Sequence, residues 1–201
     1  MLNGIGPASL FILGVNIALG LLAMGNPRIM ERCVFRPYEF ARGLRRGTIV
    51  ASGFAHADLP HLAFNMITFW FFGVPLERTI GTPMFVLLYV IGLLLSQLQS
   101  YRKHRDDPEY GTLGASGAVS AVLFAMIVYY PTMSLYMFFV PIPIPAPVFG
   151  VAYIAYSWWS GKQNRGRINH DAHLGGALAG LAFVAVTDLP AFLRAINLIF
   201  S

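Results

Sequence analysis

The sequence is poor in charged residues. Asp, Glu, Lys and Arg together make up 11% of the 201 residues, whereas hydrophobic residues make up 56% and the mean hydropathy is +0.61. A soluble domain needs a charged surface that this composition does not supply, so the scarcity of charge excludes an ordinary soluble fold. The composition predicts a chain that lies in a lipid bilayer.

Cysteine is almost missing as well, because Cys33 is the single one. One cysteine excludes an intrachain disulfide, and no Cys and His spacing resembles a zinc knuckle. Lys and Arg number 14 against 9 Asp and Glu, but no basic stripe is interleaved with aromatic residues, and the charges cluster between apolar segments. We therefore expect no nucleic-acid partner, no metal and no cofactor, and we place the loop charges at lipid headgroups.

Six apolar segments approach the roughly 20 residues that a transmembrane helix needs. They cover about 7–24, 59–80, 83–101, 113–130, 146–160 and 170–187. The first has no basic region before it and no small-residue cleavage site after it, so we expect a retained span and not a signal peptide. The tail 189–200 predicts an amphipathic helix at the membrane interface. The expected fold is all-α, a polytopic membrane protein with six transmembrane helices in one domain over residues 1–201.

Two connections between these segments are unusual. Residues 25–58 form a long loop with six arginines and apolar pairs, which indicates a segment that rests on or in the membrane. In 141–147, prolines recur at every second position and exclude an α-helix, because proline lacks an N–H and displaces the preceding residue from the helical region. We expect an apolar loop there, followed by a short fifth helix.

Polar residues stand at the starts of the second, fourth and sixth segments. If successive spans alternate in direction, these three segments begin at the same face of the membrane. His61, Asn65, Ser116 and His173 then lie within roughly 10 Å of one interface, given a rise of 1.5 Å per residue. Each alone is more often a hydrogen-bonded packing residue, and a serine among small residues also suits helix packing in lipid. Their coincidence at one depth favours a site.

These residues supply the groups that acyl transfer needs. Ser116 is the candidate nucleophile and His173 the candidate general base. His61 and Asn65 are four residues apart on one helical face and are candidate oxyanion donors. The Ser116 backbone N–H is another donor, because unpaired N–H groups and the positive dipole end lie at a helix start. Asp171 lies two residues from His173 and faces another way, so we expect a Ser-His dyad and not a triad.

Glycines in the sixth segment explain how the two residues could meet. Gly176 and Gly180 follow His173 on the same helical face and form a G-x-x-x-G ridge. Together with Gly117 on the fourth segment, this ridge permits a close backbone approach that would bring His173 within hydrogen-bond reach of Ser116. These glycines are structural whether or not the site is catalytic.

The pattern resembles the rhomboid family of intramembrane serine proteases, from the second segment to the sixth. The motifs that carry the resemblance are His56-x4-His61-x3-Asn65, Gly73-x3-Glu77 with Arg78 and Gly81, Gly114-Ala115-Ser116-Gly117, and Ala172-His173-x2-Gly176-x3-Gly180. The resemblance implies that Ser116 is the nucleophile and His173 the base. It also implies an oxyanion hole made by His61, Asn65 and the Ser116 N–H, and cleavage of transmembrane protein substrates near the bilayer surface.

The same resemblance assigns supporting roles. Gly114 would be the close-approach residue beside the oxyanion hole, and His56 a supporting loop residue. The turn from Gly73 to Glu77 would stabilise the far end of the second helix. The chain departs from the family pattern at Gly47-Thr48, where a Trp-Arg pair is common, and at Ser120, where some members place a tyrosine against the base. Neither departure removes a catalytic group.

Three other functions fit part of the pattern. A catalytically inactive rhomboid-like factor would bind membrane proteins without cutting them, but the presence of both Ser116 and His173 argues against it. A metal site of His56, His61, His170 and His173 would have no H-E-x-x-H helix and few carboxylates nearby. A channel or transporter would carry polar residues across the membrane, whereas here they gather near one face.

Charge counting and the resemblance disagree about orientation. The loops 25–58, 102–112 and 161–169 on the candidate site's side hold 12 of the 14 Lys and Arg residues, and the positive-inside rule places them in the cytoplasm. The family's usual bacterial form has this side outside. We adopt that orientation because a membrane-embedded first loop is a poor case for charge counting, and we expect the cytoplasmic (inner) membrane of a bacterium.

Overall fold

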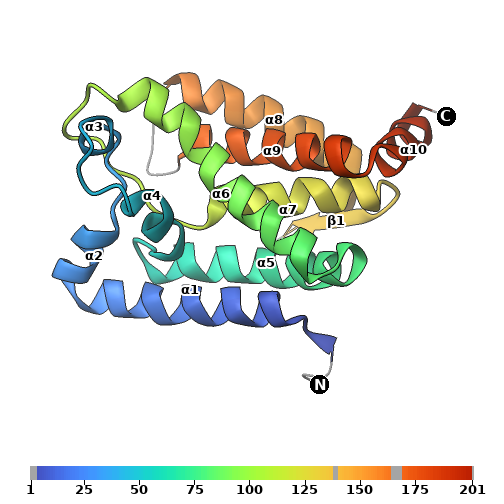
Figure 1. Ribbon diagram of the computed structural model, residues 1–201. Helices are drawn as coiled ribbons and strands as arrows, with labels where there is room; N and C mark the ends of the chain where they lie inside the picture. The colour runs from blue at the N-terminus through green and yellow to red at the C-terminus, as the bar shows by residue number, and fades with distance from the viewer. Residues whose placement is uncertain (1–3, 138–139, 164–168, 201) are drawn as a thin grey trace.

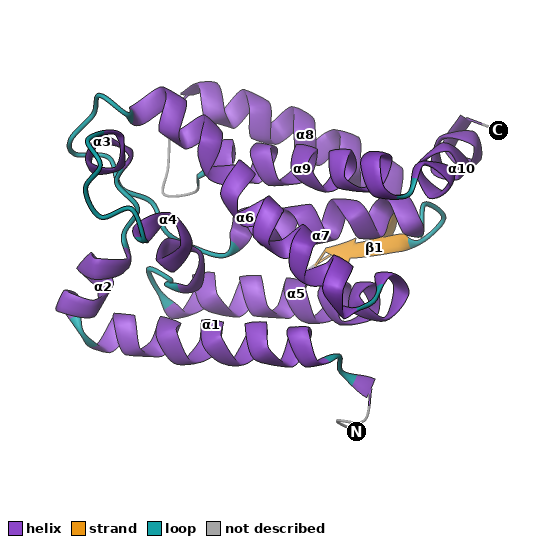
Figure 2. Cartoon of the chain, in the orientation of Figure 1, coloured by secondary structure: helices purple, strands orange, loops and turns teal. Residues whose placement is uncertain are grey.

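The computed structural model describes residues 4–137, 140–163 and 169–200. The regular secondary structure of these ranges is helical apart from one hairpin and one isolated bridge, and loops join the elements (Figures 1 and 2). The elements in chain order are α1 (Pro7–Gly25), α2 (Pro27–Cys33), α3 (Pro37–Ala41), α4 (Thr48–Ala51), the 3-10 helix η2 (Ser52–Phe54), α5 (Leu59–Ile80), α6 (Thr82–His104), α7 (Ser116–Tyr129), β1 (Ser134–Met137), β2 (Val140–Pro145), α8 (Ala146–Gln163), α9 (His170–Thr187) and α10 (Leu189–Phe200). Two arginines of the charge count, Arg165 and Arg167, lie outside the described residues.

Helix α7 is the centre of the bundle. Twelve of its fourteen residues are buried, and it packs against α5, α6 and α9, while α1 lies along α5 and α8 along α9 (Figure 1). Because α7 carries small residues such as Gly117, Ala118 and Ala121, neighbouring backbones can approach it closely. Successive long helices run in opposite directions, so α5, α7 and α9 all begin at one end of the bundle (Figure 1).

Helices occupy all six segments that the sequence predicts. Within the described ranges, α1, α5 and α6 are long and apolar enough to cross a membrane, and α9 with α10 forms a fourth candidate if that pair, bent by 116°, counts as one span. Helix α7 has only 14 residues and is shorter than a usual span. The helical, polytopic membrane fold is therefore established, whereas six crossings stay a prediction.

The start of α1 is held by the end of α5. No side chain at the N-cap position of α1 bonds to its first N–H groups. Instead, the Glu77 carboxylate accepts hydrogen bonds from the backbone N–H of Ala8 (3.0 Å) and Ser9 (2.7 Å), and from Thr82 Oγ1 (2.7 Å). A carboxylate at a helix N-terminus is favoured by the dipole and satisfies unpaired donors. Glu77, which is only 2% exposed, thus joins α1, α5 and α6.

The long connection between α1 and α5 is built from the short helices α2, α3 and α4. Arg36 and Arg45 pair with Glu31 at 2.9 and 3.2 Å and hold the pKa of that carboxyl below its usual value. Phe35 forms a two-way backbone bridge with Thr112, so this connection is anchored to the segment that leads into α7. At the family-pattern position Gly47-Thr48, Thr48 starts α4, and its hydroxyl donates to the Arg45 carbonyl (2.7 Å).

The proline-rich segment is a strand, not the loop that we expected. β2 pairs with β1 in an antiparallel hairpin, with Leu135 opposite Ile144 and Tyr136 opposite Pro143. In a two-stranded ribbon every second N–H points away from the partner strand, so prolines at alternate positions remove donors that the pairing does not use. The exclusion of a helix was correct. The same spacing also suits an edge strand.

Candidate active site

His61 and Asn65 lie in the first two turns of α5. Asp58 precedes the helix, and its carboxylate accepts a hydrogen bond from the His61 backbone N–H at 2.8 Å. This cap, with Pro60 in the first turn, fixes where the helix begins. The Asn65 side chain donates to the His61 carbonyl at 2.9 Å. An amide has two N–H groups, so this bond leaves Asn65 one further donor.

His61 lies against the backbone just before Ser116. Gly114 has φ +122°, and its N–H donates to the Ser52 carbonyl at 2.8 Å. A Cβ atom at Gly114 would lie 2.5 Å from His61 Cε1 and 2.7 Å from Nε2. Only glycine tolerates both this conformation and this contact. Gly114 therefore allows the imidazole to approach within two residues of Ser116.

Ser116 is the first residue of α7 and is partly exposed. Ala115 precedes it at the N-cap position and offers no side chain to accept hydrogen bonds from the helix start. The first N–H groups of a helix have no partner within the helix. The serine hydroxyl and backbone donors thus lie together at the positive end of the buried helix.

The start of α9 is fixed by Asn169. Its side-chain oxygen accepts a hydrogen bond from the Ala172 N–H (3.0 Å), and its amide donates to Ser100 Oγ (3.0 Å) and Thr112 Oγ1 (2.9 Å). One side chain therefore caps α9 and ties it to α6 and to the segment before α7. His173 follows one residue after the capped N–H and is partly exposed.

Helices α7 and α9 touch backbone to backbone. A methyl group at Gly176 would overlap the Gly117 carbonyl, and one at Gly180 would overlap the Ala121 carbonyl. A Cβ at Gly117 would overlap the Ser96 side chain and lie 3.4 Å from the Ala172 carbonyl oxygen. The contact between Gly117 and Ala172 thus joins the residue after Ser116 to the residue before His173.

The two candidate catalytic side chains are not hydrogen-bonded to each other. Among the described residues, Ser116 Oγ makes no hydrogen bond to His173. Hydrogen bonds between catalytic groups are often long without substrate and tighten when it binds. The backbone contact sets the distance between the two helices that carry Ser116 and His173.

Asp171 is directed away from His173. Its carboxylate contacts Lys103 Nζ at 3.1 Å and accepts from Gln99 Nε2 at 2.9 Å. Lys103 also donates to the Gly161 carbonyl at the end of α8, at 2.6 Å. Asp171 therefore links the start of α9 to α6 and α8, and in the described part of the chain no carboxylate is hydrogen-bonded to His173.

His56, in the loop before α5, lies against His61. It is fully buried, and its ring meets the His61 ring edge-on with centroids 5.0 Å apart. Burial, and then the neighbouring His61, lowers the pKa of His56 to about 4, so it is neutral at pH 7. Over the described ranges, no group of three or more His, Cys, Asp or Glu residues is arranged to hold a metal ion.

The sequence did not indicate Tyr153 of α8. Its ring stacks on His173, with centroids 6.0 Å apart and planes 17° apart, and its hydroxyl lies 2.7 Å from Ser120 Oγ. No motif surrounds Tyr153, and its contacts join residues far apart in sequence. The caps Asp58 and Asn169 were also missed, although an Asp or Asn just before an apolar helix is a recognisable start signal.

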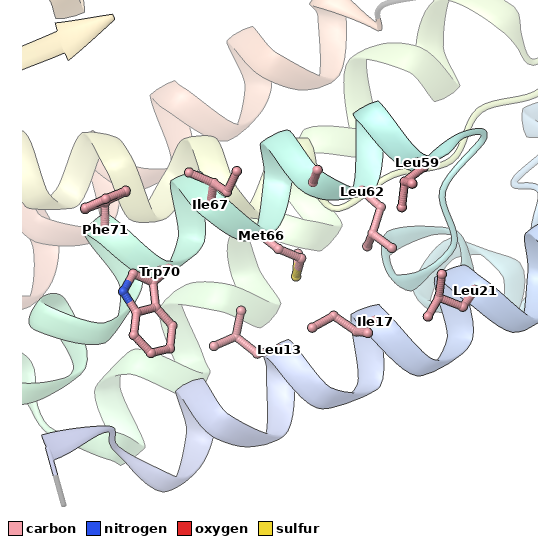
Figure 3. A pocket seen from close by; sticks show the side chains of 10 residues that line it. Leu13, Ile17, Leu21, Leu59, Leu62, Met66, Ile67, Trp70 and Phe71 are labelled. Atoms are coloured by element: carbon pink, nitrogen blue, oxygen red, sulfur yellow. The ribbon is translucent and has the colours of Figure 1, made fainter. Parts of the chain in front are cut away.

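A separate apolar groove of about 480 Å³ lies between α1 and α5 (Figure 3). Its lining residues are Leu13, Ile17, Leu21, Leu59, Leu62, Ala63, Met66, Ile67, Trp70 and Phe71. On α5 these residues occupy the face opposite His61 and Asn65, as the helical spacing requires. The groove contains none of the candidate catalytic residues.

The fold and the site together define a class: a helical membrane protein with a serine and a histidine at the starts of adjacent, closely packed helices. A profile of the Rhomboid domain matches residues 44–188 of this chain. The chain therefore belongs to the rhomboid family.

Its relatives include several mitochondrial proteins. RHOMBOID-like protein 12, mitochondrial, from Arabidopsis thaliana is 32% identical over 71% of this chain and 47% of its own length. Rhomboid protein 1, mitochondrial, from Saccharomyces cerevisiae is 29% identical over 86% of this chain and 51% of its own length. The human (Homo sapiens) presenilin-associated rhomboid-like protein, mitochondrial, is 33% identical over 68% of this chain and 36% of its own length. The chain spans about half the length of the first two of these relatives.

Proposed function

We propose that this chain is an intramembrane serine protease that cuts membrane proteins in or near their transmembrane segments with a Ser116-His173 dyad. The observation that supports this most is the close contact between α7 and α9 at Gly117 and Gly176. It brings the residue after Ser116 against the turn of α9 that follows His173. Membership of the rhomboid family supports the same reaction class.

In the proposed reaction, Ser116 Oγ attacks the scissile carbonyl carbon while His173 takes the hydroxyl proton. His61, Asn65 and the Ser116 N–H stabilise the oxyanion that forms. Collapse of this intermediate breaks the C–N bond, and His173 gives its proton to the leaving amine. Water, deprotonated by His173, then hydrolyses the acyl-serine and restores the free hydroxyl.

We also propose that the six long helices α1, α5, α6, α7, α8 and α9 all cross the bilayer in one domain. The alternating directions of these helices support this arrangement (Figure 1). The described protein is an integral membrane protein. A bacterial inner membrane stays our proposal for its location, although the relatives named above are mitochondrial.

The substrates that we propose are single-span proteins with small residues at the cut and a helix breaker in the following turns. A scissile carbonyl within a helix is engaged in the backbone ladder, so the substrate must unwind before Ser116 can reach it. Unwinding costs least near water or beside Gly and Pro. One substrate carrying a Gly-Ala-rich segment is compared with the same substrate carrying a continuous Leu run, and equal cleavage rates would contradict this account.

A fluorophosphonate probe tests the reaction class directly. We expect the purified, folded chain to be labelled at Ser116, as located by peptide mapping, and the Ser116→Ala chain to stay unlabelled at that peptide. Heat-denatured protein is the control for non-specific acylation. If folded protein is not labelled but still binds a transmembrane peptide, the chain is instead a catalytically inactive rhomboid-like binding factor.

A further inference from the structure

The ring of Tyr153 is the aromatic partner of the candidate base. The Tyr153 and His173 centroids are 6.0 Å apart and the two planes differ by 17°, which is an offset stack within the range of favourable aromatic contacts. Tyr153 belongs to α8 and His173 to α9, so the contact joins two helices that are packed side by side.

The hydroxyl of the same tyrosine is fixed on α7. It lies 2.7 Å from Ser120 Oγ, and Ser120 is only 4% exposed and stands one turn after Ser116. The Tyr153 ring also contacts Phe124, the next turn of α7, with centroids 5.4 Å apart. Tyr153 therefore reaches from α8 to the helix of the nucleophile and to the helix of the base.

The His173 ring has one further aromatic contact in the described part of the chain, an edge-on approach of His170 with centroids 5.9 Å apart, and Tyr153 is the partner that lies nearly parallel to its plane. Asp171, the neighbouring acid, is engaged by Lys103 and Gln99. In a triad the acid orients the imidazole through a hydrogen bond. In a dyad, which has no such acid, packing contacts must orient the imidazole.

We propose that Tyr153 is the positioning residue for His173, supplied from α8, and that Ser120 serves as its anchor on α7. This inference rests on the proposed protease function. It also explains why α7 carries a serine at 120: a larger side chain there would occupy the place of the Tyr153 hydroxyl. Tyr153 does not touch the reacting atoms, so its effect is on the orientation of the base.

The test measures the rate of fluorophosphonate labelling of Ser116 against pH, the kcat and KM for a transmembrane substrate, and the thermal unfolding midpoint, all on the full chain. We expect Tyr153→Leu to lower the labelling rate and kcat by roughly 10-fold, to leave KM unchanged and to move the acid limb of the pH profile. Tyr153→Phe keeps the ring and should stay within about 3-fold of the parent, as should Ser120→Ala, because each loses one hydrogen bond.

Trp158→Leu is the matched control, because Trp158 is an exposed aromatic residue on the same helix. We expect it to leave the labelling rate, kcat, KM and the unfolding midpoint unchanged. Tyr153→Met replaces Tyr153→Leu if the latter does not fold. A parental labelling rate in a folded Leu or Met variant overturns the inference, and so does a loss that follows the unfolding midpoint while the pH profile stays in place. If the parent itself is not labelled at Ser116, the protease proposal fails, and the role of Tyr153 fails with it.

Discussion

Helices α8 and α9 have the same length and lie side by side, but they are held very differently. Ten of the eighteen residues of α9 are buried, against five of eighteen in α8. Helix α9 meets α7 backbone to backbone through its glycines, whereas α8 packs mainly on α9 and leaves Val148, Val151 and Trp159 exposed. The candidate base thus stands on a closely packed helix, and its aromatic partner stands on a loosely packed one.

This difference separates two requirements of the proposed reaction. The nucleophile and base need a constant distance, and close backbone packing gives one because interiors at this density resist deformation. A substrate helix needs a way in, and a helix with few buried residues can shift at lower cost. Tyr153 links the two, so movement of α8 would alter the orientation of His173.

The largest effect is expected on the dyad itself. Ser116→Ala and His173→Ala should each abolish proteolysis, and the double variant should be no slower than either, because the two groups act as one unit. Cleavage of a transmembrane substrate is measured beside the unfolding midpoint. Parental cleavage by a folded Ser116→Ala chain would show that the nucleophile is another residue.

Next come the oxyanion donors of α5. His61→Ala and Asn65→Ala should each slow turnover by about 10² to 10³, and less where backbone N–H groups compensate. The expected change is in kcat and not in KM. Chelators should leave the rate of the parent unchanged. A loss of activity with chelator that added zinc restores would support the metal site instead.

The comparison of α9 with α8 is tested by one substitution made in both. Gly176→Ala places a methyl group on the Gly117 carbonyl, and we expect a cost of about 1 to 3 kcal/mol in stability and a marked loss of activity. Gly150→Ala on α8 is the matched control, because its Cβ would lie 3.5 Å from Phe124 in ordinary contact. Equal effects of the two variants on the unfolding midpoint would mean that α9 is not the more closely held helix.

A smaller effect is expected where α8 and α9 are tied together. Lys103→Met removes the partner of Asp171 and the donor to the Gly161 carbonyl. We expect about 1 kcal/mol of destabilisation, less than for Gly176→Ala, because Lys103 is partly exposed. Lys162→Met, at an exposed lysine of α8, is the control. A double-mutant cycle with Asp171→Asn that gives no coupling energy would show that the ion pair contributes nothing.

The smallest effect at neutral pH concerns His56. Its pKa is about 4 in the folded chain against 6.5 ordinarily, so between these values the unfolded chain binds more protons. The contribution of His56 to stability is therefore complete above pH 6.5 and is lost as pH falls toward 4. His56→Phe should flatten this part of the curve of unfolding free energy against pH. An identical slope in both proteins would mean that His56 does not titrate in this window.

The sequence predicted the helices well because lipid imposes long apolar runs with recognisable ends. The bounds of α5 and α9 match the predicted segments, and the motif around Ser116 placed the candidate site at helix starts. Contacts made across the fold left no such signal. The Gly73-x3-Glu77 motif indicated Glu77 but not its contact with the start of α1, and no motif indicated that Tyr153 contacts His173. The hairpin was not predicted, because alternating prolines exclude a helix but do not by themselves distinguish a loop from an edge strand.

The shortness of α7 has a consequence for water. Fourteen residues span about 21 Å, whereas the hydrocarbon layer is roughly 30 Å thick. Tyr129 and Tyr130 end the helix with hydroxyls bonded to Asp188 and Thr79, and tyrosines favour the headgroup level. With that end at one surface, Ser116 lies about 9 Å below the other. Water would therefore have to reach the proposed acyl-serine below the lipid headgroups, at a depth where the surrounding bilayer is dry.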